Sequence, residues 1–345
     1  MVAAADVRRR RTRETRRNAG FTLTELMVVV VLMGVLVVGV MGTFAAQKRT
    51  TGVNSQVVDA QHATRLIGDL LEEDIRHTGM MVPEGGALCA IDRTSGADTL
   101  FVTDAAAIDP SDEIRNDLGA RIGGGGNNVS SGSNTLALDA LVVEVATPSA
   151  AYDTDSNGTN DSDFRVGGGV IVTDAGNPGR GAACGTVTAV AIGSVQITVD
   201  IDSDPLGPMP AGPEPVDLVA IPAHVYTVNG SLQLVRNGTP VADDVEDLQI
   251  AVFIDADEDH TIDAGEYRGD GVGANFDPQG VDLGLAREVR ANVVIRTRFE
   301  DDENANGRFQ DSENRAAASA NDGYRRRVYT STVMLRNVGG RVSTT

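Results

Sequence analysis

An uncharged segment near the N-terminus constrains the fold of this chain more than any other feature. From Leu26 to Gln47 no residue carries a charge, and most of the side chains are apolar. A helix needs roughly 20 such residues to cross the hydrocarbon core of a membrane. Seven arginines precede the segment, within residues 8–17, and basic residues favour the cytoplasmic side of a membrane. The sequence therefore predicts one membrane span, with everything after Lys48 on the opposite side.

One carboxylate, that of Glu25, lies at the border of this apolar segment. Moving a carboxylate toward the centre of a bilayer costs roughly 2.5–3.5 kcal/mol, so such a residue normally has a partner. Glu25 ends the stretch Gly20-Phe21-Thr22-Leu23-Thr24-Glu25, which follows a basic leader and precedes the apolar helix. In this arrangement the chain resembles the N-terminus of type IV pilins and type II secretion pseudopilins.

The resemblance implies three events at this N-terminus. A prepilin peptidase would cleave between Gly20 and Phe21 on the cytoplasmic side, and the new Phe21 amine would be methylated. Glu25 would pair with the N-terminal amine of a neighbouring subunit in a filament, because the two charges then neutralise each other. The alternative is an ordinary signal peptide or signal anchor. A secretory signal, however, is cleaved at small residues after its apolar core, whereas Gly20 precedes the core.

The net charge limits the possible partners, and the two cysteines allow one disulfide. The leader carries seven arginines against Asp6 and Glu14, so its removal changes the formal charge from −20 to −25. This acidity argues against nucleic acid and anionic lipid as partners and favours divalent cations. Cys89 and Cys184 both follow the apolar segment, and an oxidising compartment permits a disulfide between them. We predict this disulfide, with two free buried thiols as the alternative.

Helical periodicity continues beyond the apolar segment. Apolar residues recur at helical spacing from Val53 to Ile75, and no proline interrupts them. Gly79 is expected to end the helix, which would run from Thr22 to Thr78. We predict a cytoplasmic leader over residues 1–20, a membrane or filament-core helix over 21–47 and an amphipathic continuation over 48–79. A β-rich domain with calcium-loop inserts would fill residues 80–345.

The remainder of the chain has the pattern of strands between turns. The predicted strands are Thr99–Thr103, Thr135–Ala146, Val166–Val172, Gly185–Asp200, Val216–Val228, Ser231–Arg236, Leu248–Asp255, Val289–Phe299 and Arg326–Arg336. Asn229-Gly230 predicts a type I′ hairpin turn. No helical segments alternate with these strands, which argues against a doubly wound sheet. We predict an α+β, pilin-like fold in which the second half of the helix lies on one antiparallel sheet.

Three later segments extend the family resemblance. Residues 69–80, 241–253 and 329–337 resemble the helix end, a strand entry and the closing strand of PilW-like minor pilins and of pseudopilin J. These segments are less specific than the N-terminal one. The resemblance does not cover the region from about Pro83 to Ala223 or the acidic inserts.

Three acidic loops have the spacing of calcium loops, which provide about six to eight oxygens from alternate residues, a backbone carbonyl and a late carboxylate. The ligands predicted in one loop are Asp302, Asn304, Asn306, the Arg308 carbonyl and Glu313. In a second they are Asp255, Asp257, Asp259, Thr261, Asp263 and Glu266, although His260 replaces the usual glycine. The third offers Asp153, Asp155 and Asn157, and because it lacks a closing glutamate, Asp161 or Asp163 would have to close it.

The alternative for each loop is a solvated acidic turn, because Asp, Asn and Gly are common in turns. The flanking residues read as strands, so bound calcium would stiffen the loops rather than act as a switch. No motif indicates catalysis, since the four histidines lack metal-ligand spacing and the glycine clusters lack a phosphate-binding sequence. Arg325–Arg327 opens a predicted strand and faces either an acidic neighbour or solvent.

We therefore predict a structural subunit rather than an enzyme: a PilW-like minor pilin that waits in the inner membrane and then enters a filament. From the resemblance we expect a place near the tip or in the initiating complex. Its partners would be other pilin subunits, the prepilin peptidase and the inner-membrane assembly platform, with calcium as the bound ion. The alternatives are a type II secretion pseudopilin J in a periplasmic pseudopilus, and a membrane-tethered calcium-dependent adhesin or hydrolase.

Overall fold

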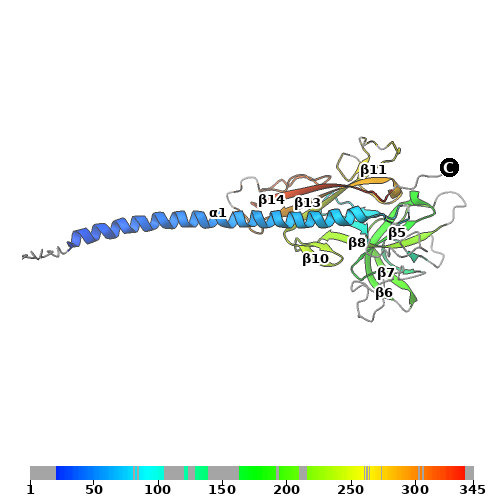
Figure 1. Ribbon diagram of the computed structural model, residues 1–345, viewed down its shortest axis with the longest axis horizontal. Coiled ribbons are helices and arrows are strands. Elements are labelled where there is room, and N and C mark those ends of the chain that lie inside the picture. Colours follow the sequence, from blue (N-terminus) through cyan, green and yellow to red (C-terminus); the bar gives the residue numbers. More distant parts are fainter. Residues whose placement is uncertain are drawn as a thin grey trace, which may run out of the picture. The chain divides into compact units, whose positions relative to one another are not determined.

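The computed structural model describes residues 21–80, 82–83, 85–104, 120–122, 129–138, 163–191, 194–209, 216–259, 261, 263, 265–272, 274–301, 304 and 307–338. The chain divides into two compact units, Met1–Ser55 and Gln56–Thr345. One helix, α1, spans Leu23–His77 and contributes residues to both units (Figure 1). It is the one helix among the described residues that is long and apolar enough to cross a membrane.

Local sequence sets both ends of α1. At its start the Thr22 amide donates to Glu25 Oε2 at 2.9 Å, and the Glu25 amide donates to Thr22 Oγ1 at 3.3 Å. This reciprocal capping box satisfies amides that the first helical turn leaves without partners. The helix ends at His77, two residues before Gly79, which adopts a φ of +80°. The predicted stop at Gly79 is therefore confirmed, because a left-handed residue terminates a helix.

The larger sheet of the second unit is antiparallel throughout. It has ten strands, with a main order of β1-β2-β8-β5-β6-β7-β4, while β3 and β9 pair with β8 and β10 pairs with β9. The strands are β1 (Leu88–Ile91), β2 (Thr99–Thr103), β3 (Ala120–Arg121), β4 (Gly132–Ala137), β5 (Gly169–Asp174), β6 (Ala182–Ala191), β7 (Gln196–Ile201), β8 (Leu218–Val228), β9 (Leu234–Arg236) and β10 (Thr239–Ala242). One 3-10 helix, η2 (Pro178–Arg180), lies between β5 and β6.

The smaller sheet has four antiparallel strands in the order β12-β11-β13-β14. Its strands are β11 (Val245–Ile254), β12 (Tyr267–Arg268), β13 (Ala286–Arg296) and β14 (Arg326–Met334), and the 3-10 helix η4 (Leu283–Leu285) precedes β13. The fold is thus a long helix with antiparallel sheets, which confirms the predicted α+β, pilin-like class.

The second half of α1 contacts both sheets, whereas the sequence predicted one. Glu72 accepts hydrogen bonds of 2.6 Å from the hydroxyls of Tyr329 and Ser331 on β14. Asp74 accepts hydrogen bonds from Tyr226 on β8 at 2.5 Å and from Arg236 on β9 at 2.9 Å. The prediction failed because the pattern placed these two acids away from the packed face. In the fold Glu72 and Asp74 lie beside the buried apolar residues of α1, and each forms hydrogen bonds to one of the two sheets.

Most predicted strands are present, although their ends are shifted and one predicted strand is two strands in the structure. The segment predicted as one strand over Gly185–Asp200 is a hairpin, in which β6 pairs with β7 from Gly185↔Ile201 to Ala191↔Gln196. Its apolar residues continue across the turn, so the pattern alone did not reveal the reversal. The short strands β1, β3, β10 and β12 were not predicted. The second half of the predicted strand Thr135–Ala146 lies outside the described residues.

The hairpin at Asn229 forms with a different turn from the one predicted. β8 ends at Val228 and β9 begins at Leu234, so five residues connect them rather than two. Asn229 Oδ1 accepts from the amides of Ser231 at 2.9 Å and Gln233 at 3.0 Å. The left-handed residue is Leu232, with a φ of +57°. The Asn229 side chain therefore organises a wider loop in place of the type I′ turn.

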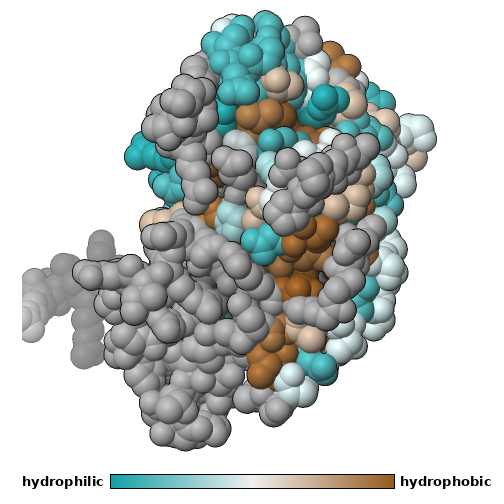
Figure 2. All heavy atoms as spheres, turned by 90° about the vertical axis from the view of Figure 1, so that its right-hand side faces the viewer, coloured by the Kyte–Doolittle hydropathy of each residue, from teal (hydrophilic) through white to brown (hydrophobic). Residues whose placement is uncertain are grey.

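The disulfide between Cys89 and Cys184 lies in the interior of the second unit and joins β1 to β6. Both cysteines are fully buried in the core that also contains Ile67 and Leu71 of α1. A second buried cluster, which includes Val172 and Ile197, covers the opposite face of the larger sheet. Figure 2 shows a face on which hydrophobic residues form a band beside hydrophilic ones.

Candidate functional site

The start of α1 leaves the Glu25 carboxylate partly available. Its Oε2 atom accepts from the Thr22 amide and from Thr22 Oγ1, each at 2.9 Å. Its Oε1 atom has no hydrogen-bond partner among the described residues. Phe21, which precedes the cap, is 83% exposed, and Gly20 lies outside the described residues. The geometry keeps the carboxylate at the positive end of the helix dipole while one oxygen stays free to meet a cation.

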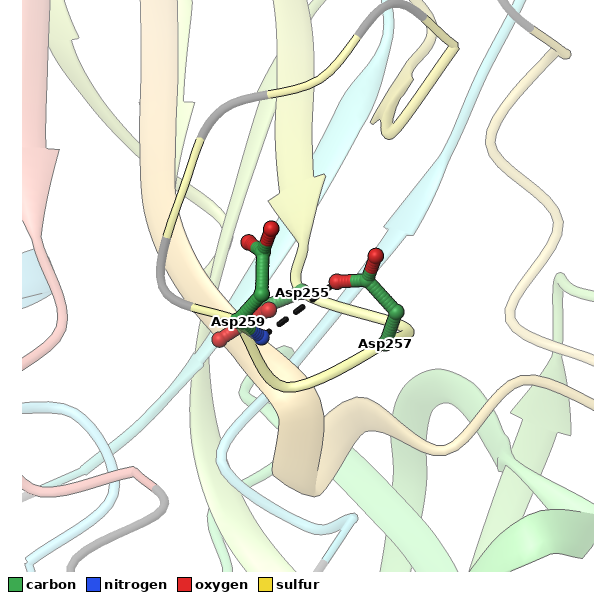
Figure 3. Close-up of side chains that lie close together, drawn as sticks. All are labelled: Asp255, Asp257 and Asp259. Carbon is green, nitrogen blue, oxygen red and sulfur yellow. Dashed lines mark hydrogen bonds between the residues drawn. The ribbon is translucent and has the colours of Figure 1, made fainter.

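The loop after β11 brings three carboxylates together (Figure 3). One carboxylate oxygen from each of Asp255, Asp257 and Asp259 lies within 4.8 Å of the others. The Asp259 amide donates to Asp257 Oδ1 at 3.3 Å, and the Thr261 amide donates to Asp259 Oδ1 at 2.7 Å. Oxygens from alternate residues thus lie close to one another, and a calcium loop also draws its oxygens from alternate residues. Asp255 is fully buried, whereas the other two carboxylates are exposed.

Two other predicted ligands of this loop, Asp263 and Glu266, do not belong to that group. The Asp263 amide donates to Glu266 Oε2 at 2.9 Å, so these two residues close a turn of their own. Asp255 also faces Arg287, whose Nε atom is 3.4 Å from Asp255 Oδ2. The sequence did not predict this arginine as a neighbour. The donors present at the first three positions fit a hard divalent cation, which prefers carboxylate oxygen.

The loop predicted around Asp302 is only partly described, since Asp302 and Asn306 lie outside the described residues. Glu313, its predicted closing carboxylate, accepts two hydrogen bonds of 2.7 Å from Arg290 on β13 and another from Asn292. Asn304 donates to the carbonyls of Gly323 and Tyr324. The Arg308 carbonyl accepts from Gln310 at 3.3 Å. Glu313 therefore anchors the loop to the sheet, and it would have to leave Arg290 to bind calcium.

The predicted ligands Asp153, Asp155, Asn157 and Asp161 all lie outside the described residues.

A third group of acids was missed because its members are far apart in the sequence. Asp98 is buried, and its carboxylate accepts from the amides of Arg93 at 2.7 Å and Ile250 at 2.8 Å. Burial is the main reason that the pKa of Asp98 is raised to about 8; the two amide hydrogen bonds oppose this rise, and the nearby Asp92 and Asp247 add to it. Asp98 fastens the loop after β1 to the edge of β11, so its role is structural.

A cavity of about 310 Å³ lies between α1 and the start of β14. Its lining includes Arg308, Arg325, Arg326 and Arg327. Arg325 pairs with Asp301 at 2.7 Å, and Arg326 pairs with Glu246 at 2.5 Å. Among the described residues, the lining contains no histidine, cysteine or carboxylate.

Two protein-family models match the chain, one near its N-terminus and one in its last third. Residues 15–41 match the model of the prokaryotic N-terminal methylation motif. Residues 223–337 match the model of the type IV pilus-assembly protein W, PilW. The chain is thus similar to type IV pilins at its N-terminus and to PilW in its last third. This confirms the predicted resemblance, and the PilW match spans about a third of the chain, including β11, β13 and β14.

Comparison of structures finds a type IV-like pilin from Thermus thermophilus, 13% identical, with a TM-score of 0.21. The match covers 51% of this chain and 88% of that pilin. No curated protein sequence matches the chain significantly. The methylation motif begins in the basic leader and ends within the apolar part of α1. It thus covers Gly20, Phe21 and Glu25, and the PilW domain covers the Asp255 and Asp302 loops.

Proposed function

We propose that this PilW-domain protein is a minor pilin, a structural subunit of a type IV pilus-type filament that takes part in its initiation near the tip. The observation that carries the proposal is the methylation motif, which runs into an apolar helix whose first turn contains Glu25. Before assembly, α1 would hold the chain in the inner membrane with the second unit in the periplasm. Neighbouring pilins, the prepilin peptidase and the assembly platform would be its partners.

Processing of the N-terminus tests this proposal. Mass spectrometry of the chain purified from its own cells should give a mature protein that begins with N-methylated Phe21. Replacing Gly20 with alanine should leave the leader attached, whereas replacing Gly34 in the middle of the helix should leave processing unchanged. A mature N-terminus beyond the apolar segment, after Gln47, would instead identify a secretory signal and contradict the proposal.

We also propose that calcium stabilises the second unit through Asp255, Asp257 and Asp259. Without a cation these carboxylates repel one another, and calcium would remove that repulsion. At a calcium concentration 100-fold above the dissociation constant, binding stabilises the folded state by about 2.7 kcal/mol. Addition of calcium to the detergent-solubilised chain should therefore raise its melting temperature by several degrees, and calorimetry should record heat of binding.

Matched variants make this prediction specific. The double variant Asp257→Asn, Asp259→Asn should lose most of the calcium-dependent shift. The control Asp243→Asn, Asp277→Asn changes the same formal charge at two other exposed aspartates and should keep the shift. Equal shifts in both variants, or none in the natural chain, would contradict calcium binding at this loop.

A further inference from the structure

Strand β14 forms an open edge of the smaller sheet. It is the last strand in the order β12-β11-β13-β14 and pairs only with β13 among the described strands. The register runs from Arg296↔Arg326 to Glu288↔Met334 without a bulge. Proteins usually protect such an edge with a bulge, a proline, a lysine or a covering segment, because its free backbone groups pair readily with other chains.

The hydrogen-bond pattern identifies the free backbone groups. At the two ends of the ladder, the Thr297 amide donates to the Arg325 carbonyl and the Leu335 amide donates to the Arg287 carbonyl, each at 2.8 Å. Residues of an antiparallel pair alternate between bonding across the pair and turning away from it. The odd-numbered residues of β14 therefore bond to β13. The even-numbered residues direct their amides and carbonyls outward: Arg326, Val328, Thr330, Thr332 and Met334.

These outward backbone groups have no backbone partner among the described residues, and the side chains beside them are accessible. Val328 is 51% exposed and Met334 is 69% exposed. The segment from Val328 to Leu335 contains no charge, proline or glycine and consists mainly of residues that favour strands. An uncharged strand of this kind on an edge is a strong template for an added strand.

The inner side of β14 is held firmly while its edge stays free. The hydroxyls of Tyr329 and Ser331 both donate to Glu72 of α1, and these hydrogen bonds lower the pKa of the Glu72 carboxyl. Glu72 is therefore charged at neutral pH and fastens the strand to the helix. A template held in place in this way loses little conformational freedom when a partner strand arrives.

The charges at the ends of the strand restrict the partner. Arg327 and Arg336 are exposed, and no carboxylate of the described residues lies within ion-pair distance of either. A second β14 strand carries arginines and no carboxylate near its ends, so an antiparallel pairing of two copies would place basic end beside basic end. Pairing two copies would therefore gather positive charge at both ends of the added strand without any compensating carboxylate. A strand with a carboxylate near each end would complement both arginines.

We propose that the free edge of β14 receives an extended strand of a different filament subunit, uncharged in its middle and acidic near both ends. The smaller sheet would gain a fifth strand, joined through the outward amides and carbonyls of residues 326–334. This partner assignment rests on the proposed function as a filament subunit.

Photo-crosslinking in cells tests the proposal with the full chain. A photoreactive phenylalanine analogue is placed at Val328 or at Thr332, both exposed, and the adducts are mapped by mass spectrometry. The control position is Thr135, an exposed threonine of the edge strand β4. The Thr135 amide also points away from the neighbouring strand β7. Leu138 donates to Val195 across this pair, so the even-numbered residues of β4 bond to β7, and Thr135, which lies opposite Thr198, does not.

If a partner strand pairs with β14, the crosslinked positions on the partner should have a fixed spacing, which a general surface contact would not give. The adducts from Val328 and Thr332 should fall on one segment of the partner, about four residues apart, because paired strands advance in step. Thr332→Pro removes an outward amide without breaking the ladder to β13, so it should reduce the Val328 adduct about tenfold. The matched Thr135→Pro should not reduce it. Formation of the Cys89–Cys184 disulfide checks that each variant folds.

The outcomes separate this inference from the proposed function. Adducts that fall on scattered peptides, on a second copy of the same chain, or equally at Thr135 would overturn the edge proposal, as would their absence from filaments that contain the chain. If the chain never enters filaments while Val328 and Thr332 still give adducts in register on another protein's strand, the edge proposal stands and the filament function fails.

Discussion

Replacing Glu25 with alanine should reduce incorporation of the chain into filaments about a hundredfold. In the natural chain the Glu25 carboxylate would enter the filament core paired with the amine of a neighbouring subunit. Moving a charge into such an apolar environment without a counter-charge costs roughly 2.5–3.5 kcal/mol. Alanine leaves the amine of the neighbouring subunit without its counter-charge. The measurement is the amount of the chain in sheared filaments relative to the amount in membranes.

Two controls separate charge from helix capping. Glu25→Gln keeps an oxygen that can accept from the Thr22 amide, since glutamine also completes a capping box. It loses the charge, so it should be as defective as Glu25→Ala. Glu73→Gln makes the same change at an exposed position of α1 and should have no effect. Normal incorporation of Glu25→Gln would show that capping, and not charge, is the contribution of Glu25.

Replacing Asp174 with alanine should destabilise the second unit by about 3–5 kcal/mol. Asp174 is fully buried at the end of β5, and its Oδ2 atom is 2.7 Å from Nη1 of the buried Arg180. It also accepts hydrogen bonds from Asn177 and from the Asp217 amide. The alanine variant would leave a buried guanidinium without this carboxylate. Thermal unfolding of the solubilised chain measures the loss.

A rescue variant distinguishes the uncompensated charge from a simple loss of packing. The double variant Asp174→Ala, Arg180→Met removes both charges and should recover part of the lost stability, because methionine fills a similar volume. Removing the exposed carboxylate of Asp243 should change the melting temperature little. A double variant no more stable than the single one would contradict the assignment of the loss to the Arg180 charge that Asp174 no longer balances.

The same carboxylate should make stability depend on acidic pH. Burial alone would raise the pKa of Asp174, but the Asp217 amide, Arg180 and Asn177 outweigh burial and lower it. A group whose pKa is lower in the folded state contributes stability above its unfolded pKa, near 4. That contribution is lost as the pH falls through the folded pKa. The slope of stability against pH below 4 should therefore be smaller in Asp174→Ala than in the natural chain.

Features that depend on neighbouring residues could be predicted from the sequence. The helix from Leu23 to His77, its stop at Gly79 and most strands follow from periodicity and turn residues within short windows. The N-terminal resemblance to pilins depends mainly on six consecutive residues, Gly20 to Glu25. The close approach of Asp255, Asp257 and Asp259 also reflects local spacing in one loop.

Features that join distant segments could not be predicted from the pattern. Glu72 and Asp74 looked like solvent-facing residues of an amphipathic helix, and only tertiary contacts show that Tyr329 and Tyr226 meet them. Glu313 had the correct spacing to close a calcium loop, but Arg290 on another strand engages it. The sequence does not distinguish a glutamate that binds calcium from one that pairs with an arginine, because the difference depends on which residues the fold places beside it.

The docking of α1 has a mechanical consequence. Glu72 and Asp74 lie within one helical turn and hold β14 on one sheet and β8 with β9 on the other. A pull along the helix axis would therefore strain both attachments simultaneously, in shear, rather than peeling one sheet away before the second. Tension would be divided between the sheets, and rupture would require both acids to release their partners together.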